Sequence, residues 1–536
     1  MTTAAPDRFR LLRPHNGHLL GVALLAGLFV YLSFFPLWHT DVWAHAKYGE
    51  WYWNHKSTPP VEPLSPYTDK AAPFANVAWL SQVVYDGLYE FGAAVVGEDA
   101  ESRLRGGAEA LRSFHLLLLL GRFTLLLLAL RRFGGSWAWA ALGTVLYLFA
   151  LRAEVAVQRP QAFGVFFLVA ILYALSAPRL SRRATVVLPL LFLLWSNLHG
   201  TFVVGLAVLG LHSLGRIIER GPRDSDVRRL FITGVLCGLA TLMNPHGPWL
   251  YTHIFAFSGH PNLKSMSEWF PMELAGARPY LMSLVLLAFV RVLGGRKVGA
   301  AGWLVALPFA AWPWMQGRAV LWWWAIAVWL LARLGPGLGD KFATLPSLPE
   351  GERTRTKAWA AVGLAALAAL FFPPIRTLVV PADVDHTVSP GTPWRLALEL
   401  TADPADEGRW MPDLRTAMRE HFPGGRYRGA IFASETQGDF LIWALPAETP
   451  VMMFTHAHVF GPDHWEACRH VKAGNPGWRE FLAGHRANLI VAETDTHPEL
   501  ADQLRSDADW EVVHDGPSSP TSDRGTVIVA VRKQPL

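Results

Sequence analysis

Charged residues are scarce in this sequence, and the shortage indicates its class. Asp, Glu, Lys and Arg make up 17% of the 536 residues, whereas hydrophobic residues make up 51%. A soluble domain carries about 25% charged residues. The chain therefore has more apolar surface than a soluble domain of this length, and the composition indicates a membrane protein.

Cysteine and several catalytic motifs are also lacking. The two cysteines, Cys237 and Cys468, lie in an apolar run and in a polar region. A disulfide framework and a CxxC metal or redox motif are thereby excluded. The sequence has no P-loop, no GxGxxG after a strand and no GxSxG elbow, so nucleotide use and serine hydrolase chemistry have no support.

The net charge of +5 is modest, and the basic residues lie in short clusters between apolar runs. This distribution is typical of the topology signal of a membrane protein, whose cytoplasmic loops are rich in Lys and Arg. It does not resemble the concentrated basic patch of a nucleic-acid-binding protein, so we predict no nucleic-acid partner.

Tryptophan and long apolar runs are abundant. The 24 tryptophans suit a protein with many membrane interfaces. The first run, 17–37, follows three arginines and exceeds the ~20 residues that cross a bilayer. No small-x-small cleavage site follows it, so we predict an uncleaved helix with a cytoplasmic N-terminus. The other predicted spans are 111–130, 137–151, 162–175, 185–198, 201–214, 231–243, 281–293, 303–311, 319–331 and 358–372.

These patterns predict a polytopic α-helical membrane domain, residues 1–373, with about 11 spans and a large first outer loop at 38–110. Within that loop, 42–54 and 76–91 have the spacing of short helices that lie on the membrane surface. The tail, residues 374–536, is polar, and helical stretches alternate in it with strand-like runs at 430–433, 451–454, 488–492, 511–513 and 526–531. It is predicted to be a soluble α/β domain with a largely parallel sheet. An odd number of spans places it on the outer side.

Polar residues gather at the outer ends of the predicted spans, whereas the inner ends carry mainly Arg and Lys. Polar groups near a bilayer are unfavourable unless they face a cavity or a partner. A one-sided collection therefore predicts a single outward-facing site. The residues of this collection are Asp41, Arg159, Asn197, His199, Asn244, His246, Glu268 and Arg318.

Asp41 stands at the exit of the first span. Its carboxylate can act as a general base towards an acceptor hydroxyl or bind a metal, or it is a solvated interfacial group. His39 and His45 flank it and offer zinc ligands, although their spacing does not match a helical HExxH motif. The tail has a further group of histidines, which shows no recognised metal spacing: His456, His458, His464 and His470.

The other outer-end residues also have two interpretations. Arg159 and Arg318 can bind phosphate oxygens bidentately, or they extend to the interface as ordinary membrane arginines. The NLHG and NPHG motifs, at 197–200 and 244–247, can bind a lipid head group or cap helix ends. Glu268, followed by Trp269, offers a second carboxylate or a platform on which a sugar stacks.

The chain resembles the GT-C superfamily of integral-membrane glycosyltransferases, and most of all bacterial members related to the protein mannosyltransferase, aminoarabinose transferase and Rgt-like groups. The resemblance rests on Asp41 at the start of the first outer loop, the aromatic segment TDVWAHAKYGEWYW, a Pro-rich elbow and the amphipathic run NVAWLSQVVYDGLY. The chain is also similar to bacterial multi-span proteins with RP, NLHG, NPHG and EW motifs and a soluble tail. The likeness covers residues 17–335.

The resemblance implies transfer of a sugar from a polyprenyl-phosphate-linked donor to an acceptor glycan, lipid or protein on the outer side of the bacterial cytoplasmic membrane, with inversion at the anomeric carbon. Asp41 takes the place of the catalytic acid. Many relatives have an Asp-Glu pair where this chain has Asp41-Val42, which leaves the second carboxylate to Glu50 or Glu268. His39 and His45 are further candidate accessory residues, and a divalent metal is a candidate cofactor with no ligands assigned.

Donor phosphate or head-group binding falls to the remaining outer-end residues, which are Arg159, Arg318, Asn197, His199, Asn244 and His246. Two other interpretations stay open on the sequence. One is a transporter of lipid-linked solutes, which predicts polar residues along the span interiors. The other is a non-catalytic envelope assembly or scaffold protein whose tail binds a protein partner.

Overall fold

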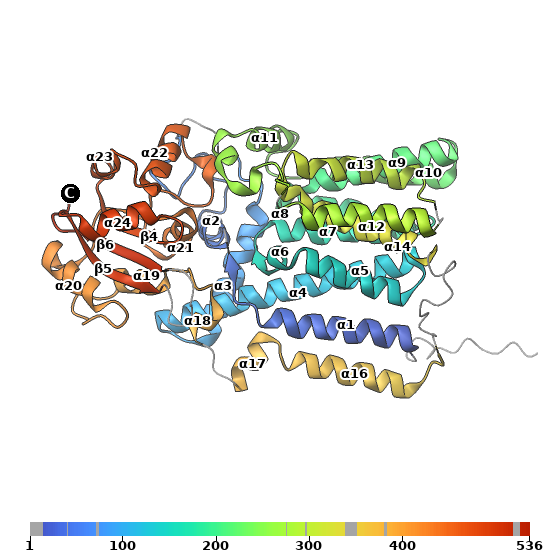
Figure 1. Ribbon diagram of the computed structural model, residues 1–536, viewed down its shortest axis with the longest axis horizontal. Helices are drawn as coiled ribbons and strands as arrows, with labels where there is room; N and C mark the ends of the chain where they lie inside the picture. Colours follow the sequence, from blue (N-terminus) through green and yellow to red (C-terminus); the bar gives the residue numbers. More distant parts are fainter. Residues whose placement is uncertain are drawn as a thin grey trace, which may run out of the picture.

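Long apolar helices and a small sheet lie at opposite ends of the molecule (Figure 1). The structure is a computed structural model, and it describes residues 14–39, 41–70, 74–274, 276–294, 297–337, 351–379, 383–517 and 526–536. The helices of the first loop lie between the two ends. This order places the loop where it contacts both the bundle and the tail.

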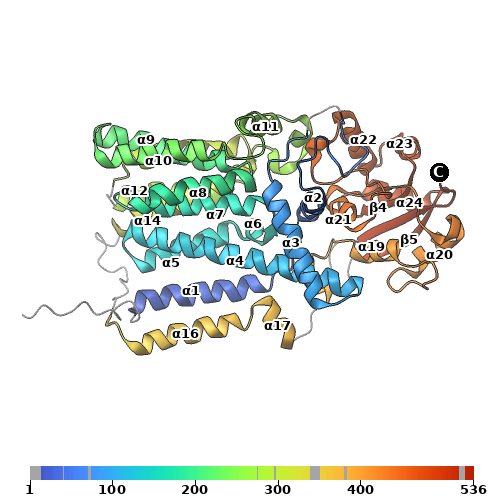
Figure 2. The ribbon, with the colours of Figure 1, turned by 180° about the vertical axis from the view of Figure 1, so that it is seen from behind.

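Each apolar run that was predicted as a span lies on a helix, and these helices run side by side in both views (Figures 1 and 2). The longest is α4. Asp99 caps its N-terminus, and Gly135, whose φ is 79°, caps its C-terminus. The helices of the bundle are α1 (Asn16–Ser33), α4 (Ala100–Gly134), α5 (Trp137–Ala150), α7 (Gln161–Leu175), α8 (Arg182–Leu198), α9 (Phe202–Arg220), α10 (Ser225–Ala240), α12 (Arg278–Gly294), α13 (Ala300–Ala311), α14 (Val320–Leu334) and α16 (Arg355–Ala369).

Four segments of the described chain are long and apolar enough to cross a bilayer: α1, α4, α9 and Gly317–Leu334. A fifth candidate is α16 with α17 (Pro373–Val379), which are bent by 69° where they meet. The helices α5 and α7 are apolar but shorter. The count of about 11 spans therefore stays a prediction.

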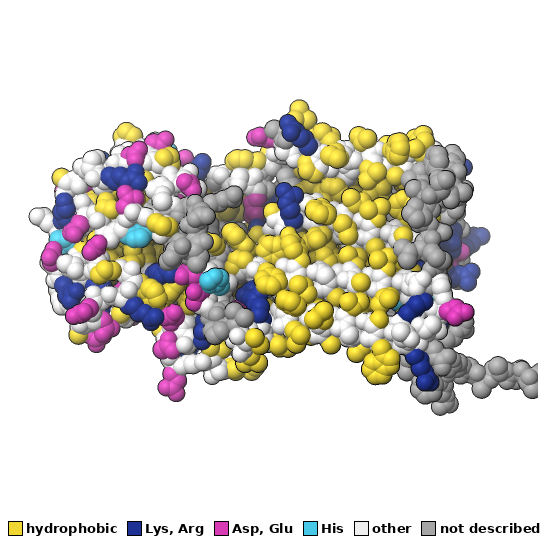
Figure 3. Space-filling view, turned by 60° about the horizontal axis from the view of Figure 1, so that its bottom comes forward, with side chains coloured by type: hydrophobic (Ala, Val, Ile, Leu, Met, Phe, Trp, Pro, Cys, Tyr) yellow, Lys and Arg dark blue, Asp and Glu magenta, His cyan; other side chains and the backbone are white. Residues whose placement is uncertain are grey.

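Hydrophobic side chains cover the face of the bundle that Figure 3 shows, and charged side chains gather on the tail, at its junction with the bundle and at the bundle's far end. Val186, Ile232 and Val285 are among the exposed apolar residues of the bundle. An apolar belt of this extent is the surface that lipid covers. The chain is a membrane protein.

The first outer loop contains two helices, as the sequence predicted: α2 (Val42–His55) and α3 (Trp79–Val96). The chain leaves α2 at Lys56, which adopts a left-handed conformation with φ of 52°. The two helices pack so closely that a Cβ atom at Gly49 would lie 2.2 Å from the carbonyl oxygen of Gln82. Glycine at this position therefore permits the contact between α2 and α3.

A short parallel ladder joins the start of the first loop to the bundle. Its strands are β1 (Trp38–His39) and β2 (Val157–Gln158), with His39 opposite Gln158. The helix α6 (Arg152–Ala156) precedes β2. The pairing brings Asp41, two residues after β1, beside Arg159, the residue that follows β2.

The tail contains a four-stranded sheet in the order β3-β4-β6-β5. Its strands are β3 (Ala430–Phe432), β4 (Ala487–Glu493), β5 (Trp510–Pro517) and β6 (Thr526–Arg532). The helices of the tail and of the connection before it are α17, α18 (Val384–Thr387), α19 (Trp394–Thr401), α20 (Pro412–His421), α21 (Glu435–Ala444), α22 (Pro462–Lys472), α23 (Trp478–Gly484) and α24 (Pro498–Ser506); α11 (Trp249–Ser258) lies in an outer loop of the bundle.

The prediction of a largely parallel sheet was wrong. Only β3 and β4 pair in parallel, whereas β6 is antiparallel to both β4 and β5. A parallel connection needs a dozen or more residues, and the eight between β5 and β6 are too few. The predicted strand at 451–454 is a single bridge between Val451 and Ile431.

The tail packs directly on the first loop. Trp43 of α2 is fully buried, with its ring 5.1 Å from that of Phe440 and 4.6 Å from that of Trp443, both on α21. Two isolated bridges, Leu37 to Val388 and Thr68 to Phe460, add backbone contacts. The tail therefore forms one wall of whatever site the first loop builds.

Candidate functional site

A cavity of about 510 Å³ opens where the first loop, the outer ends of the bundle helices and the tail meet. Six residues that the sequence singled out line it together: Asp41, His45, Arg159, His199, Glu268 and Arg318. The tail contributes Thr455, His456 and His458, and the first loop also contributes Asn76 and Gln82. These residues thus line a single space bounded by three parts of the chain.

Asp41 is the residue immediately before α2, and its carboxylate makes no capping bond to that helix. Its Oδ2 lies 3.8 Å from Nε2 of His45, one turn along. Burial opposes ionisation of Asp41, but the neighbouring ring of His45 and the charge of Arg159 hold its pKa well below the usual range. Asp41 is therefore an ionised carboxylate at the edge of the cavity.

Two arginines converge on Glu268. Nη1 of Arg159 lies 2.8 Å from its Oε2 and Nη1 of Arg318 lies 3.4 Å from its Oε1. Glu268 lies in the short helix η3 (Ser267–Trp269) and Arg318 in η5 (Gly317–Ala319). The guanidinium of Arg318 also stacks 4.8 Å from the ring centre of Trp269 and donates to Gln161 Oε1 at 3.0 Å.

The charges of the arginines and the carboxylates in this group stabilise one another. Burial alone would lower the pKa of Arg159, but the carboxylates of Asp41 and Glu268 raise it above the ordinary value. Burial would raise the pKa of Glu268, but Arg318 and Arg159 lower it. Two arginines thus face two carboxylates, so a phosphate that binds the arginines has to take the place of Glu268.

Burial lowers the pKa of three histidines of the cavity, His199, His456 and His458. Burial, followed by the charge of Arg318, lowers the pKa of His199 to about 3, and its Nδ1 lies 2.9 Å from Thr201 Oγ1. Burial also lowers the pKa of His458 to about 3 and that of His456 well below its ordinary value. These rings can accept or donate hydrogen bonds without adding charge to the site.

Several predicted head-group residues have structural partners instead. The Nδ2 of Asn197 donates to Leu193 O and Met243 O, and its Oδ1 accepts from Trp79. The Nδ2 of Asn244 donates to Thr241 O and to Gly247 O, both within three residues of it in the chain. These amides satisfy backbone groups at helix ends, so the capping interpretation of NLHG and NPHG fits the two asparagines, and the lining of the cavity includes neither.

Three further candidates have other surroundings. His246 lies 3.3 Å from Asn76 O and is not among the lining residues. Glu50 forms an ion pair with Lys47 at 2.8 Å and does not line the cavity either, whereas Glu268 does. Of the two candidates for the second carboxylate, Glu268 therefore lines the cavity and Glu50 does not. The side chain of His39 lies outside the described part of the structure.

Sequence reasoning missed Asn76, Gln82 and Thr455 as residues of the site. Gln82 could have been noticed, because it is a polar residue in the amphipathic run that becomes α3. In the structure its side chain is buried, with 1% of it exposed. A polar residue on the buried face of a helix needs a partner. His456 was noticed only as part of a histidine-rich tail segment, with nothing in the sequence to connect it to Asp41.

The described side chains of the cavity do not fit a metal ion. The set of close ligand atoms that the described residues do provide is Glu420, His421 and Glu511, whose atoms lie within 4.8 Å of one another in the tail. Within the cavity, Nδ1 of His45 already faces Gln82 at 3.0 Å.

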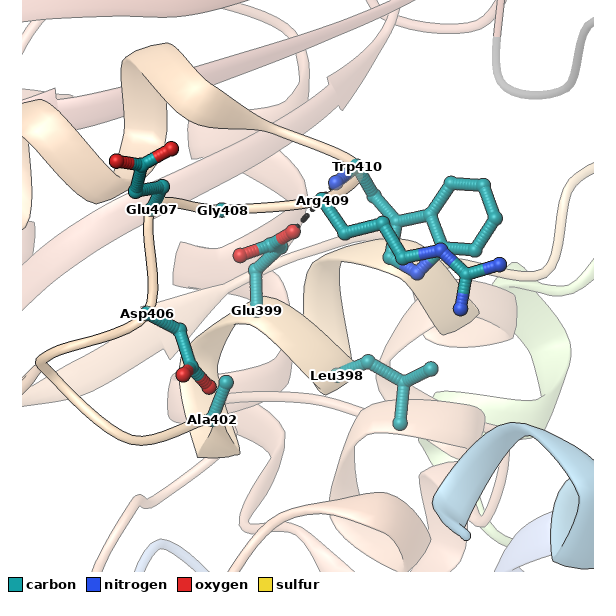
Figure 4. Close-up of a pocket in the computed structure, with 8 residues that line it drawn as sticks. All are labelled: Leu398, Glu399, Ala402, Asp406, Glu407, Gly408, Arg409 and Trp410. Carbon is teal, nitrogen blue, oxygen red and sulfur yellow. Dashed lines mark hydrogen bonds between the residues drawn. The ribbon is translucent and has the colours of Figure 1, made fainter.

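A second hollow, of about 330 Å³, lies in the tail (Figure 4). The Glu399 carboxylate points to the backbone there, where Oε1 accepts from Trp410 N at 2.6 Å, and Arg409 extends along the Trp410 ring. Oε2 of Glu399 pairs with Arg415 at 3.6 Å. The central carboxylate of this hollow is satisfied by the fold, in contrast to the larger cavity.

No family model and no curated protein matches the chain. Among solved structures, the oligosaccharyltransferase of Archaeoglobus fulgidus tethered with an acceptor peptide is similar, with a TM-score of 0.53 and 13% identity over 91% of this chain and 70% of that chain. The oligosaccharyltransferase AglB of the same archaeon, in complex with an inhibitory peptide and a dolichol-phosphate, is similar with a TM-score of 0.52. Its identity is 12% over 91% of this chain and 70% of that chain. ArnT from Cupriavidus metallidurans in the apo state has a TM-score of 0.48 and 15% identity over 96% of this chain and 97% of that chain. The chain has the fold of the Archaeoglobus fulgidus oligosaccharyltransferase, which agrees with the resemblance that the sequence indicated.

Proposed function

We propose that this protein is a membrane glycosyltransferase that moves a sugar from a polyprenyl-phosphate-linked donor to an acceptor on the outer side of the bacterial cytoplasmic membrane. The observation that carries the proposal is the meeting of an ionised carboxylate, Asp41, with the paired guanidinium groups of Arg159 and Arg318 in one cavity. The cavity lies where the apolar belt ends. A lipid whose chain stays in the bilayer can place its phosphate there.

The chemistry needs a base and a cationic site for the leaving group. Asp41 accepts the proton of the acceptor hydroxyl while the hydroxyl oxygen bonds to the anomeric carbon. The bond from that carbon to the donor phosphate oxygen breaks, and its electron pair stays on the phosphate. Arg159 and Arg318 stabilise this charge, and attack opposite the phosphate inverts the anomeric carbon.

The likeness to a structure that contains a dolichol-phosphate supports this donor class. Glu268 holds the two arginines together in the absence of substrate, and phosphate would compete with it. The neutral rings of His199 and His458 are available to bond sugar or acceptor hydroxyls. The acceptor is a glycan, a lipid or a protein that enters between the first loop and the tail.

We propose the membrane arrangement that the sequence predicted. Eleven helices cross the membrane in residues 1–373, with the N-terminus in the cytoplasm, and residues 374–536 form an extracytoplasmic domain. The side-by-side bundle and the basic far end in Figure 3 support this orientation. The test is to introduce single cysteines into the tail and to label them in intact cells with a membrane-impermeant reagent. Cysteines that the reagent does not label would contradict the arrangement.

Asp41→Asn is the decisive variant. We expect transfer from polyprenyl-phosphate sugars, extracted from bacterial membranes, to fall about 10²- to 10⁴-fold because the general base is lost. Undecaprenyl phosphate binding in lipid nanodiscs should persist. Glu90→Gln is the matched control, since Glu90 is an exposed carboxylate of the same loop that pairs with Arg103.

Full activity of Asp41→Asn would contradict the proposal. Loss of undecaprenyl phosphate binding in Arg159→Gln and Arg318→Gln should accompany loss of transfer. A wild-type protein that binds no undecaprenyl phosphate and releases none would favour the scaffold interpretation. Movement of intact lipid-linked sugar across vesicles without chemical transfer would favour the transporter.

A further inference from the structure

We infer that Asn76, Gln82 and His45 form a directed hydrogen-bond relay that orients Asp41 and gives His45 a single tautomer, with its proton on Nε2. The three side chains are positioning residues of the site, and the inference rests on the proposed role of Asp41 as the base. None of the three touches the reacting atoms in this scheme. Their effect passes through Asp41.

The direction of the relay starts at a backbone group. The amide N–H of Ala78 can only donate, and it donates to Oδ1 of Asn76 at 3.2 Å. Nδ2 of Asn76 then donates to Oε1 of Gln82 at 2.5 Å. Nε2 of Gln82 is left to donate to Nδ1 of His45 at 3.0 Å. Each amide has one donor end and one acceptor end, so the first bond determines the direction of all the others.

The consequence for His45 is chemical. Because Nδ1 accepts from Gln82, the proton of the neutral ring must be on Nε2. Nε2 is the atom that faces Oδ2 of Asp41 at 3.8 Å. The opposite tautomer would present a lone pair to the carboxylate. The relay thus aims a donor at one oxygen of Asp41, and such contacts often shorten when substrate binds.

The relay is rigid because the helices that carry it are pressed together. Gly49 lies one turn after His45 on α2, where its backbone meets the carbonyl of Gln82 on α3. Asn76, Gln82 and His45 are each more than nine-tenths buried. The tail closes the remaining side, since the ring of His456 lies edge-on to that of His45 with the centres 4.5 Å apart.

Gln82→Glu separates this role from simple packing. Glutamate has the same shape and still accepts from Asn76, but its carboxylate cannot donate to His45. Nδ1 must then carry a proton, either in place of the one on Nε2, which turns a lone pair towards Asp41, or in addition to it. Either change disturbs the contact that positions Asp41. We expect transfer to fall roughly 10- to 100-fold, the usual effect of losing a group that orients a catalytic residue, while undecaprenyl phosphate still binds.

The tautomer itself is measured without substrate. Protein labelled with ¹⁵N-histidine in nanodiscs should show His45, assigned by the signal lost in His45→Gln, as the neutral form protonated at Nε2. In Gln82→Glu the same residue should be protonated at Nδ1. Ser81→Ala is the control, because Ser81 is an equally buried polar residue of α3 that bonds only to Ala78 O. It should leave the tautomer and transfer unchanged.

The outcomes distinguish the relay from the proposed function. A wild-type His45 protonated at Nδ1, or a Gln82→Glu spectrum identical to that of wild type, overturns the relay whatever the activity. The predicted tautomers in a protein that transfers no sugar would overturn the function and leave the relay standing. Transfer by Gln82→Glu at the rate of Ser81→Ala would overturn the positioning role.

Discussion

Oδ2 of Asp439 accepts a hydrogen bond from the backbone N–H of Trp43 at 3.1 Å, across 396 residues of sequence. It also accepts from the N–H of Ala44 at 3.2 Å, and its Oδ1 accepts from Thr455 Oγ1 at 2.6 Å. The N–H groups of a first helical turn have no partners within the helix, so this carboxylate caps α2 from outside. The tail thereby determines where α2 begins, and Asp41 is the residue before it.

Asp439→Ala should therefore impair stability and transfer together. We expect a loss of about 1–2 kcal/mol, as for removal of a helix cap, seen as a lower Tm. Transfer per folded molecule should also fall, because Asp41 loses its fixed position. Asp463→Ala, which removes an exposed carboxylate at the start of α22, should change neither. An unchanged rate per folded Asp439→Ala protein would show that the tail only supports the fold.

Arg159→Gln should shift the pH dependence of transfer. The charge of Arg159 favours ionised Asp41, so its removal raises the pKa of that carboxyl. A base works only when ionised, and activity should then begin to fall at a higher pH than in the wild type. In the wild type, we expect no acid loss from Asp41 above its ordinary pKa of about 3.9. Rates from pH 4 to 8, with the donor saturating, test this, and a limb that moves to lower pH would contradict it.

Glu268→Gln should strengthen the binding of undecaprenyl phosphate, because the carboxylate that competes for Arg159 and Arg318 loses its charge. We expect about a tenfold change, equivalent to ~1.4 kcal/mol. Arg318→Gln should weaken binding by at least as much. Titration of the lipid into protein in nanodiscs measures both. If Glu268→Gln weakened binding like Arg318→Gln, Glu268 would serve to orient the arginines and not to compete with the ligand.

His458 should make the protein less stable in mild acid. Burial lowers its pKa from 6.5 to about 3, so the unfolded chain takes up a proton near pH 6.5 that the folded chain does not. Stability is full above pH 6.5 and is lost as the pH falls towards 3, by at most ~1.4 kcal/mol for each pH unit. His458→Gln should lose less Tm between pH 7 and 5 than the wild type. His470→Gln, at an exposed position, is the control.

Much of the membrane domain could be predicted from sequence because its signals are local. Each apolar run forms its own helix, since a backbone in lipid must satisfy its hydrogen bonds within the segment. The polar residues at the outer ends were likewise visible in the sequence, and Asp41, Arg159 and Arg318 do line one cavity. The strands β3, β4, β5 and β6 were also found from their apolar pattern.

The sequence by itself determined the membrane class, the helices of the bundle and the first loop, and the end of the molecule at which polar residues gather. Only the tertiary structure decided that β6 pairs antiparallel, that Glu268 lies between two arginines, that the asparagines of NLHG and NPHG serve the backbone, and that Gln82 faces His45. The reason is physical. The spacing of apolar residues determines local structure over a few residues, whereas these partners are tens to hundreds of residues apart in the sequence and meet only after the helices and the tail have packed.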